Sequence, residues 1–181
     1  ELINKLKERY GNKYDFDVPF QPGVDAIRAT RPDLSFDMVH LSCKFNRGTV
    51  SDVLEASAVI TKTQENRSFV RIPDLQQEDD LEIWTFSDAS KDTVDDKMGS
   101  VGAYIIFIAN KATGKAAPIA WRAAKVKRAC ISAMEAEALT MQEALNASIG
   151  VQQLTKECFG YSIPIMGVID NYSTYENVKT N

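Results

Sequence analysis

The order of hydrophobic patterns in the second half of this 181-residue chain limits its fold more than any other feature. Three strand-like runs, at 81–88, 101–111 and 116–121, are separated by polar or glycine-containing turns. An amphipathic helical pattern follows over 131–154, and another strand-like run occupies 161–170. A helix that returns the chain to a sheet commonly places the new strand parallel to the first one and beside it. The sequence therefore predicts an α/β domain with a mixed sheet: a three-strand meander, a helix and a parallel strand.

The first part of the chain has a different character. Two helical patterns, at 33–45 and 49–62, carry few apolar positions, with Pro32 in a first-turn position and Ser51 as an N-cap. A polar, acidic segment then precedes the strands. Because the chain begins with glutamate, we expect it to be part of a longer protein. The expected organisation is an irregular segment over 1–24, a helical region over 25–72, a linker over 73–80 and the α/β domain over 81–181.

Composition excludes several classes of protein. The net charge of -4 argues against a protein that grips nucleic acid by bulk positive charge. The longest apolar run, 101–109, is far shorter than the about 20 residues of a membrane helix, so no membrane partner is expected. Cys43, Cys130 and Cys158 are odd in number and widely spaced, which indicates reduced thiols in a cytoplasmic or nuclear compartment. His40 is the only histidine, so carboxylates must carry any catalysis.

One of the three glutamates in the 131–154 pattern is a candidate functional residue. On a helical wheel of about 100° per residue, Glu135 and Glu143 lie on the polar side and Glu137 lies in the apolar sector. Ser132 and Glu135 also form a capping box. A lone carboxylate among apolar side chains is costly unless a cation holds it. A glutamate at the rim of the packed face is an equally supported interpretation of Glu137. The apolar sector contains Met134, Ala138, Met141 and Leu145.

Two aspartates follow apolar positions at the ends of predicted strands. Asp88 shares a strand face with two aromatic residues, and Asp170 follows two apolar residues in the same way. Each alone also fits a turn or a helix cap. If the two strands are neighbours, Asp88, Asp170 and Glu137 converge at one end of the sheet. Clustered carboxylates repel one another unless a divalent cation neutralises them, and oxygen ligands favour Mg²⁺ or Mn²⁺ and phosphoryl-transfer chemistry.

Polar residues around these carboxylates are candidates for substrate binding. The segment 122–131 extends the third strand or forms a loop before the helix, and it holds a basic cluster without a nearby acid in the sequence. This cluster fits phosphate binding as well as it fits a solvated surface. The basic residues are Arg122, Lys125, Lys127 and Arg128. Residues that flank the carboxylates, and that orient substrate or act as caps, are Ser87, Ser90 and Asn171.

Four segments, in this order, resemble the ribonuclease H domain of LTR-retroelement polyproteins, nearest to the copia-type elements. They are "TFSDAS", "GSVGAYIIFI", "PIAWRAAKVKRACISAMEAEAL" and "GVIDNYST". The preceding "TRPDLSFDMVHLSCKFNRGTVSDVLEA" resembles the end of the reverse transcriptase that precedes ribonuclease H in those polyproteins. The resemblance therefore covers the chain from about residue 25 to its C-terminus.

The resemblance implies an RNase H-like fold and an endonuclease that hydrolyses the RNA strand of RNA–DNA hybrids. It implies that Asp88, Glu137 and Asp170 are catalytic and hold two Mg²⁺ or Mn²⁺ ions. A fourth acidic residue, a final strand and a final helix of the family would lie beyond Asn181, so we expect a C-terminally truncated domain. The partners implied are an RNA–DNA hybrid and the remainder of a reverse transcriptase polyprotein. The alternative is a non-catalytic remnant that binds nucleic acid or another protein.

Overall fold

The computed structural model describes residues 30–44, 49–66, 70–75, 80–91 and 99–170. The chain divides into two compact units, residues 1–69 and 70–181. The second unit is an α/β domain with a four-stranded mixed sheet, which agrees with the predicted fold class at that level. None of the helices within the described ranges is both long enough and apolar enough to cross a membrane. All three cysteines are free, as predicted.

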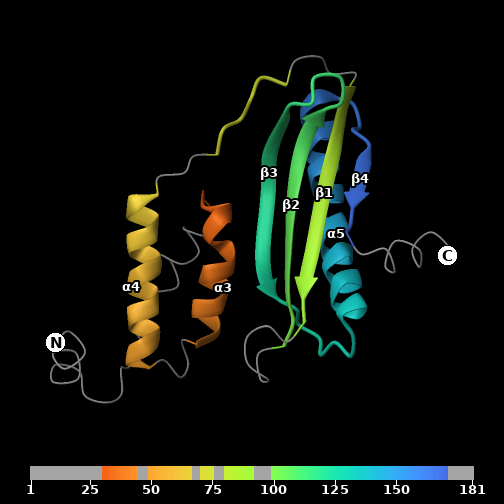
Figure 1. The fold of residues 1–181 in the computed structure, drawn as a ribbon. Helices are drawn as coiled ribbons and strands as arrows, with labels where there is room; N and C mark the ends of the chain where they lie inside the picture. Colours follow the sequence, from red (N-terminus) through yellow and green to blue (C-terminus); the bar gives the residue numbers. More distant parts are fainter. Residues whose placement is uncertain (1–29, 45–48, 67–69, 76–79, 92–98, 171–181) are drawn as a thin grey trace. The chain divides into compact units, whose positions relative to one another are not determined.

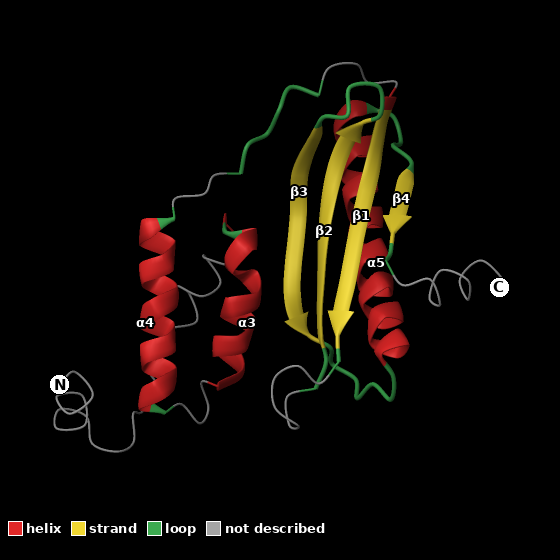
Figure 2. Ribbon diagram, in the orientation of Figure 1, coloured by secondary structure: helices red, strands yellow, loops and turns green. Residues whose placement is uncertain are grey.

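The described part of the first unit contains two helices that lie side by side (Figure 2). A 3-10 turn, η1 (Pro32–Leu34), leads into α3 (Ser35–Lys44), and α4 (Val50–Glu65) follows. Pro32 is the first residue of η1, where its missing N–H removes no helical hydrogen bond, as the sequence predicts. Among these described residues, one buried apolar cluster joins Met38 and Leu41 of α3 with Val59 of α4.

The N-terminal cap of α4 is Thr49, and the prediction of Ser51 is wrong. The Thr49 hydroxyl accepts a hydrogen bond from the backbone N–H of Asp52 at 3.4 Å. The Asp52 carboxylate accepts one from the backbone N–H of Thr49 at 2.7 Å. The helix begins earlier because Thr49 has an aspartate three residues ahead that completes a capping box, whereas Ser51 has Leu54 at that position.

The described part of the second unit contains four strands and one long helix, in the order predicted. Its elements are β1 (Leu81–Ser90), β2 (Val101–Asn110), β3 (Ala116–Lys125), α5 (Ala133–Phe159) and β4 (Ile165–Val168). The strands lie in the order β3-β2-β1-β4 (Figure 1), and β4 is the only strand parallel to β1 among those described. The helix α5 lies along one face of the sheet (Figure 1). The segment after Trp121, whose structure the sequence left open, extends the strand to Lys125.

The face of α5 that packs on the sheet is not the predicted one. Its fully buried side chains are small, and they are Ala136, Thr140, Ala144 and Ser148. The approach is close: a Cβ at Gly102 would overlap the Thr140 side chain, and the Thr85 and Ser148 hydroxyls form a buried hydrogen bond. Met134, expected in the buried sector, is 42% exposed. Small residues take the central positions because larger side chains cannot enter this gap.

The two faces of the sheet differ. Beneath α5, Ile83, Ile106 and Ile163 form the main buried cluster. On the other face, Phe86 lies edge-on to Phe107, with ring centroids 5.8 Å apart, and beside Trp84. Trp121 of β3 is half-buried. The apolar core of this unit is therefore concentrated between α5 and the sheet.

A buried asparagine joins the segment before β1 to the end of β2 through hydrogen bonds. Asn110 is fully buried; its Nδ2 donates to the Leu75 carbonyl at 2.9 Å, and its Oδ1 accepts from the Thr113 N–H at 2.8 Å. Leu75 belongs to the segment 73–80, which the sequence predicts to be a linker. That part of the linker is thus hydrogen-bonded to the last residue of β2 and belongs to the same compact unit as the sheet.

Candidate functional site

The β1–β4 register, if continued past the end of β4, leads from Asp88 toward Asp170. Every β1–β4 pair has the same offset, because 165 − 83 and 168 − 86 both equal 82, and the last pair is Phe86 with Val168. The difference 170 − 88 is also 82, but β4 ends at Val168 and Asp170 lies in a bend two residues later. The structure thus confirms that β4 lies parallel to β1 and beside it, and the convergence of Asp88 with Asp170 stays a prediction.

Glu137 reaches the same level of the sheet from α5, which runs antiparallel to β1 (Figure 1). The Ser87 hydroxyl of β1 donates to the Met141 sulfur at 3.2 Å. Met141 also packs over Gly167 of β4, where a Cβ would lie 2.5 Å from its methyl group. Glu137 precedes Met141 by one turn on the same helix face. Four helical residues and two strand residues both span about 6 Å, so Glu137 lies near the level of Ala89.

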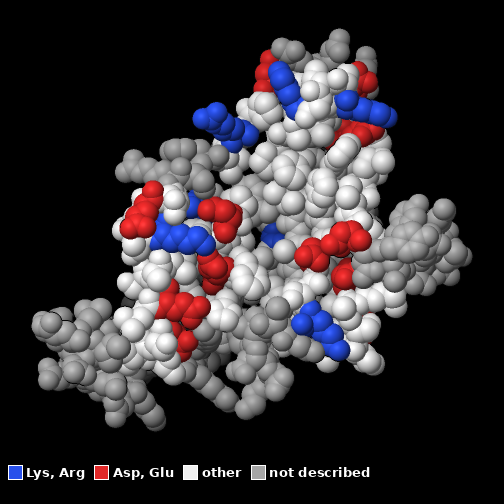
Figure 3. Space-filling model, in the orientation of Figure 1, with Lys and Arg blue, Asp and Glu red and all other residues white. Residues whose placement is uncertain are grey.

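Asp88 and Glu137 belong to opposite sides of the sheet. Thr85 and Ser87 contact α5, so the two-residue period directs Asp88 to the other face. Figure 3, which views that face, shows acidic atoms gathered over the end of β1 and beyond the tip of β4. Asp88 and Asp170 are both exposed, and Glu137 is half-buried.

Within the described residues, the edge of β1 is not paired beyond the end of β4. Because β4 ends at Val168, no strand pairs with β1 from Ser87 to Ser90 on that side. Asp88 and Glu137 lie on opposite faces, so they would have to share a ligand around this edge. Across the described part of the chain, no three or more acidic, histidine or cysteine side chains are grouped so as to hold a metal ion.

The start of α5 is fixed by polar contacts. The Ser132 hydroxyl accepts from the Glu135 N–H at 3.1 Å, as predicted for the cap. The Glu135 carboxylate accepts from the Ile131 N–H at 2.7 Å, one residue before the N–H that a capping box uses. Lys91, which sequence analysis does not single out, donates to the Ile131 carbonyl at 2.8 Å. No local pattern signals this contact, because its partners are 40 residues apart.

The predicted substrate-binding residues separate into two groups. Arg122 faces α5 and forms an ion pair with Glu143, which the sequence did not place near it. Ser87 also faces α5, through its contact with Met141, and not the side of Asp88 where a substrate was predicted.

The other group lies at the carboxylate end of the sheet. Lys125 pairs with Val101 at the end where β1 finishes, and Lys127 and Arg128 follow on the exposed loop. Ser90 is the last residue of β1. Asn171 lies outside the described residues.

Comparisons of this chain with models of protein families, with curated proteins and with solved structures found no match. Its function is therefore inferred from its residues and their positions.

Proposed function

We propose that the second unit is a ribonuclease H-like domain that hydrolyses the RNA strand of RNA–DNA hybrids with Mg²⁺ or Mn²⁺. The supporting observation is that β4 lies parallel to β1, so that Asp88 and Asp170 both lie toward the C-terminal ends of neighbouring strands, with Glu137 near that end on α5. The strand order β3-β2-β1-β4 is compatible with the layout that the sequence resemblance implies. By the same resemblance, we propose that the first unit is the end of a reverse transcriptase.

The donor atoms of the carboxylates suit a hard divalent cation, because carboxylate oxygens are the ligands that Mg²⁺ prefers. Asp88 and Asp170 would form the main part of the cation site, since both are exposed and lie toward the C-terminal ends of two neighbouring parallel strands. Glu137 would complete it from the α5 side of the β1 edge. A bound cation would supply Lewis-acid activation of water and would stabilise charge on the phosphate oxygens.

The chain's own residues would bind and orient the hybrid at this edge. Lys127 and Arg128 are exposed on the loop that leads to α5, so their charges can hold backbone phosphates. Within the described residues no strand pairs with β1 beyond Val168, and Asp88 and Asp170 are exposed, so a large substrate can reach them. Selection for RNA would come from contacts to 2′-hydroxyl groups, which requires no reading of base sequence.

A non-catalytic module is the second candidate, and the geometry gives it a specific argument. Asp88 and Glu137 lie on opposite faces of the sheet, and no group of three ligands occurs among the described residues. A domain with this arrangement would still present Lys127 and Arg128 to a nucleic acid. Binding of a hybrid without its hydrolysis would favour this candidate.

The proposed hydrolysis is tested with an end-labelled RNA–DNA hybrid in the presence of Mg²⁺. We expect the wild-type chain to cleave the RNA strand and to leave duplex DNA intact. The Asp88→Asn variant should lose this activity, because the amide cannot supply a charged ligand. The control variant, Asp74→Asn, makes the same charge change at an exposed position at the other end of the sheet and should cleave normally.

Tryptophan fluorescence shows whether each variant is folded, since both tryptophans, Trp84 and Trp121, lie in the sheet. A folded wild-type chain that binds the hybrid and does not cleave it would contradict the proposed hydrolysis.

A further inference from the structure

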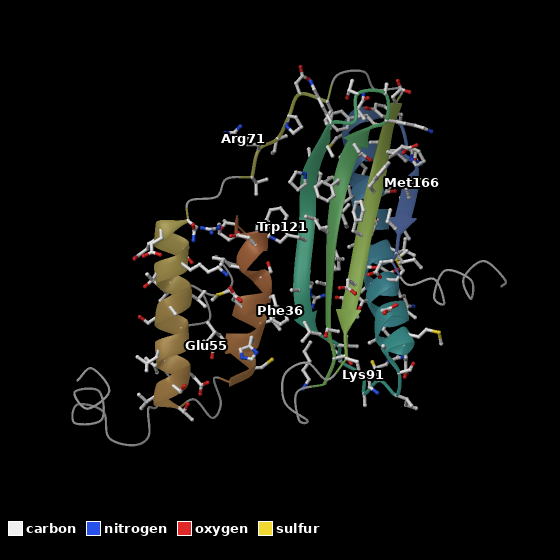
Figure 4. All side chains as sticks on the ribbon, viewed as in Figure 1. Phe36, Glu55, Arg71, Lys91, Trp121 and Met166 are labelled. Atoms are coloured by element: carbon white, nitrogen blue, oxygen red, sulfur yellow. The ribbon has the colours of Figure 1, made fainter. Side chains whose placement is uncertain are left out.

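We propose that Lys91 is a positioning residue that sets the separation between the strand carrying Asp88 and the helical turn carrying Glu137. Lys91 directly follows β1, three residues after Asp88. Its ammonium group donates to the carbonyl oxygen of Ile131, on the loop before α5, at 2.8 Å. Figure 4 shows Lys91 at the end of β1, beside this loop. This inference rests on the proposed function, because it concerns the same carboxylates.

Both backbone polar groups of Ile131 are hydrogen-bonded to charged side chains. Its N–H donates to the Glu135 carboxylate at 2.7 Å, and its carbonyl accepts from Lys91. The Ile131 side chain is 88% exposed, so burial of that side chain does little to hold the loop. Both hydrogen bonds involve a charged group, which makes each stronger than a bond between neutral groups. The end of β1, Ile131 and the first turn of α5 therefore form one connected clamp, here called the Lys91 clamp.

The Lys91 clamp joins the two elements that carry the opposed carboxylates. Glu135 precedes Glu137 by two residues, so a displacement of the first turn also moves Glu137. The first side chain of α5 that is buried against the sheet is Ala136, and Met134 before it is 42% exposed. Apolar packing thus holds this turn only through Ala136, and the Lys91 clamp adds polar contacts through Ile131. A displacement of about 1 Å can lower catalysis by on the order of a hundredfold.

The test compares Lys91→Met with Lys91→Arg and with a matched control, Lys115→Met. Methionine keeps an unbranched apolar side chain and removes the donor, whereas arginine keeps charge and donors. Lys115 makes the same kind of contact at the other end of the sheet, where its Nζ donates to the Asp74 carbonyl at 3.3 Å. Two quantities are measured in each variant: hydrogen exchange of the amides of 131–137, and the rate of hybrid cleavage as a function of Mg²⁺ concentration.

We expect Lys91→Met to speed exchange over 131–137 and to lower cleavage between about tenfold and a hundredfold. The Mg²⁺ concentration for half-maximal activity should rise, because the ligands are no longer held at the right separation. Lys91→Arg should restore most of both quantities. Lys115→Met should change neither of them. A loss caused only by unfolding would also alter tryptophan fluorescence and exchange throughout the sheet.

Hydrogen exchange tests the clamp, and hybrid cleavage tests the proposed hydrolysis, so the two proposals can fail independently. If the wild-type chain does not cleave the hybrid, the proposed function fails, and the exchange data still judge the clamp. If it cleaves and Lys91→Met cleaves with an unchanged Mg²⁺ dependence, the positioning role of Lys91 is overturned and the proposed function stands. Unchanged exchange over 131–137 in Lys91→Met would overturn the clamp itself.

Discussion

The two ends of the sheet differ in the polar side chains on which our interpretation depends. Where β1 begins, Asn110 is neutral and fully buried, and both of its polar atoms have backbone partners. Toward the end of β1 and just after β4, Asp88 and Asp170 are charged and exposed. A hydrogen bond from Lys91 to the surface loop joins this end to α5.

We expect the Asn110 end to contribute mainly to the stability of the fold and the Asp88 end mainly to the proposed function. A buried amide with all its hydrogen bonds made stabilises the fold, because replacing it leaves its partners without bonds. Exposed carboxylates repel each other where they come close. Asn110 thus stabilises one end of the sheet, while at the other end we propose that Asp88 and Asp170 serve to hold a cation.

The largest effect on stability is expected at the Asn110 end. Asn110→Ala leaves the Leu75 carbonyl and the Thr113 N–H without their partners, so the free energy of unfolding should fall by about 2 to 3 kcal/mol. Urea unfolding followed by tryptophan fluorescence measures this loss. Cleavage per folded molecule should stay at the wild-type level. A variant as stable as the wild type, or one that is folded and inactive, would break the contrast between the two ends.

A smaller loss, of stability and activity together, is expected from Gly102→Ala. Gly102 pairs with Ala89, next to Asp88, and a methyl group there would overlap Thr140 of α5. The unfolding free energy should fall by about 2 kcal/mol, because the helix must move away from the sheet. Thr140→Ala in the same chain should restore part of both stability and cleavage. If the double variant is no more stable and no more active than Gly102→Ala alone, the overlap with Thr140 of α5 does not cause the loss.

The smallest effect is expected in the middle of the sheet. Thr85→Val removes the hydroxyl that bonds to Ser148, and Ser148 keeps its hydrogen bond to the Ala144 carbonyl at 2.9 Å. Only one partner is lost, so the unfolding free energy should fall by about 1 kcal/mol. Cleavage should not change. If the unfolding free energy falls as much as in Asn110→Ala, measured in the same urea titration, buried polar side chains stabilise the middle of the sheet as strongly as its Asn110 end.

The sequence predicts the elements of the second unit well because they depend on local patterns. The strand-like runs and the helix appear in order, with ends that shift by a few residues. The placement of β4 parallel to β1 and beside it is also predictable, since a helix that returns the chain to the sheet commonly places the next strand there. Ser132 and Glu135 mark the start of α5 through a local capping pattern.

Other features depend on partners that are distant in sequence. The buried face of α5 is set by the gap above Gly102 and Thr85, which a wheel of α5 alone does not contain. The contacts of Asn110 with Leu75 and of Lys91 with Ile131 join residues 35 and 40 positions apart. Asp88 and Glu137 likewise lie on opposite sides of the sheet because α5 packs on the face of β1 that carries Thr85 and Ser87.

The most direct test of the central claim is a titration of the isotope-labelled chain with Mn²⁺, followed by NMR. Manganese broadens the signals of amides near its binding site and can occupy oxygen-ligand sites that suit Mg²⁺. If Asp88, Glu137 and Asp170 share one cation, amides near these three residues should broaden first. Amides near Asn110 should broaden last, and Asp88→Asn should abolish the selectivity. Broadening that begins elsewhere, or that is unchanged in Asp88→Asn, would contradict a shared site at this end of the sheet.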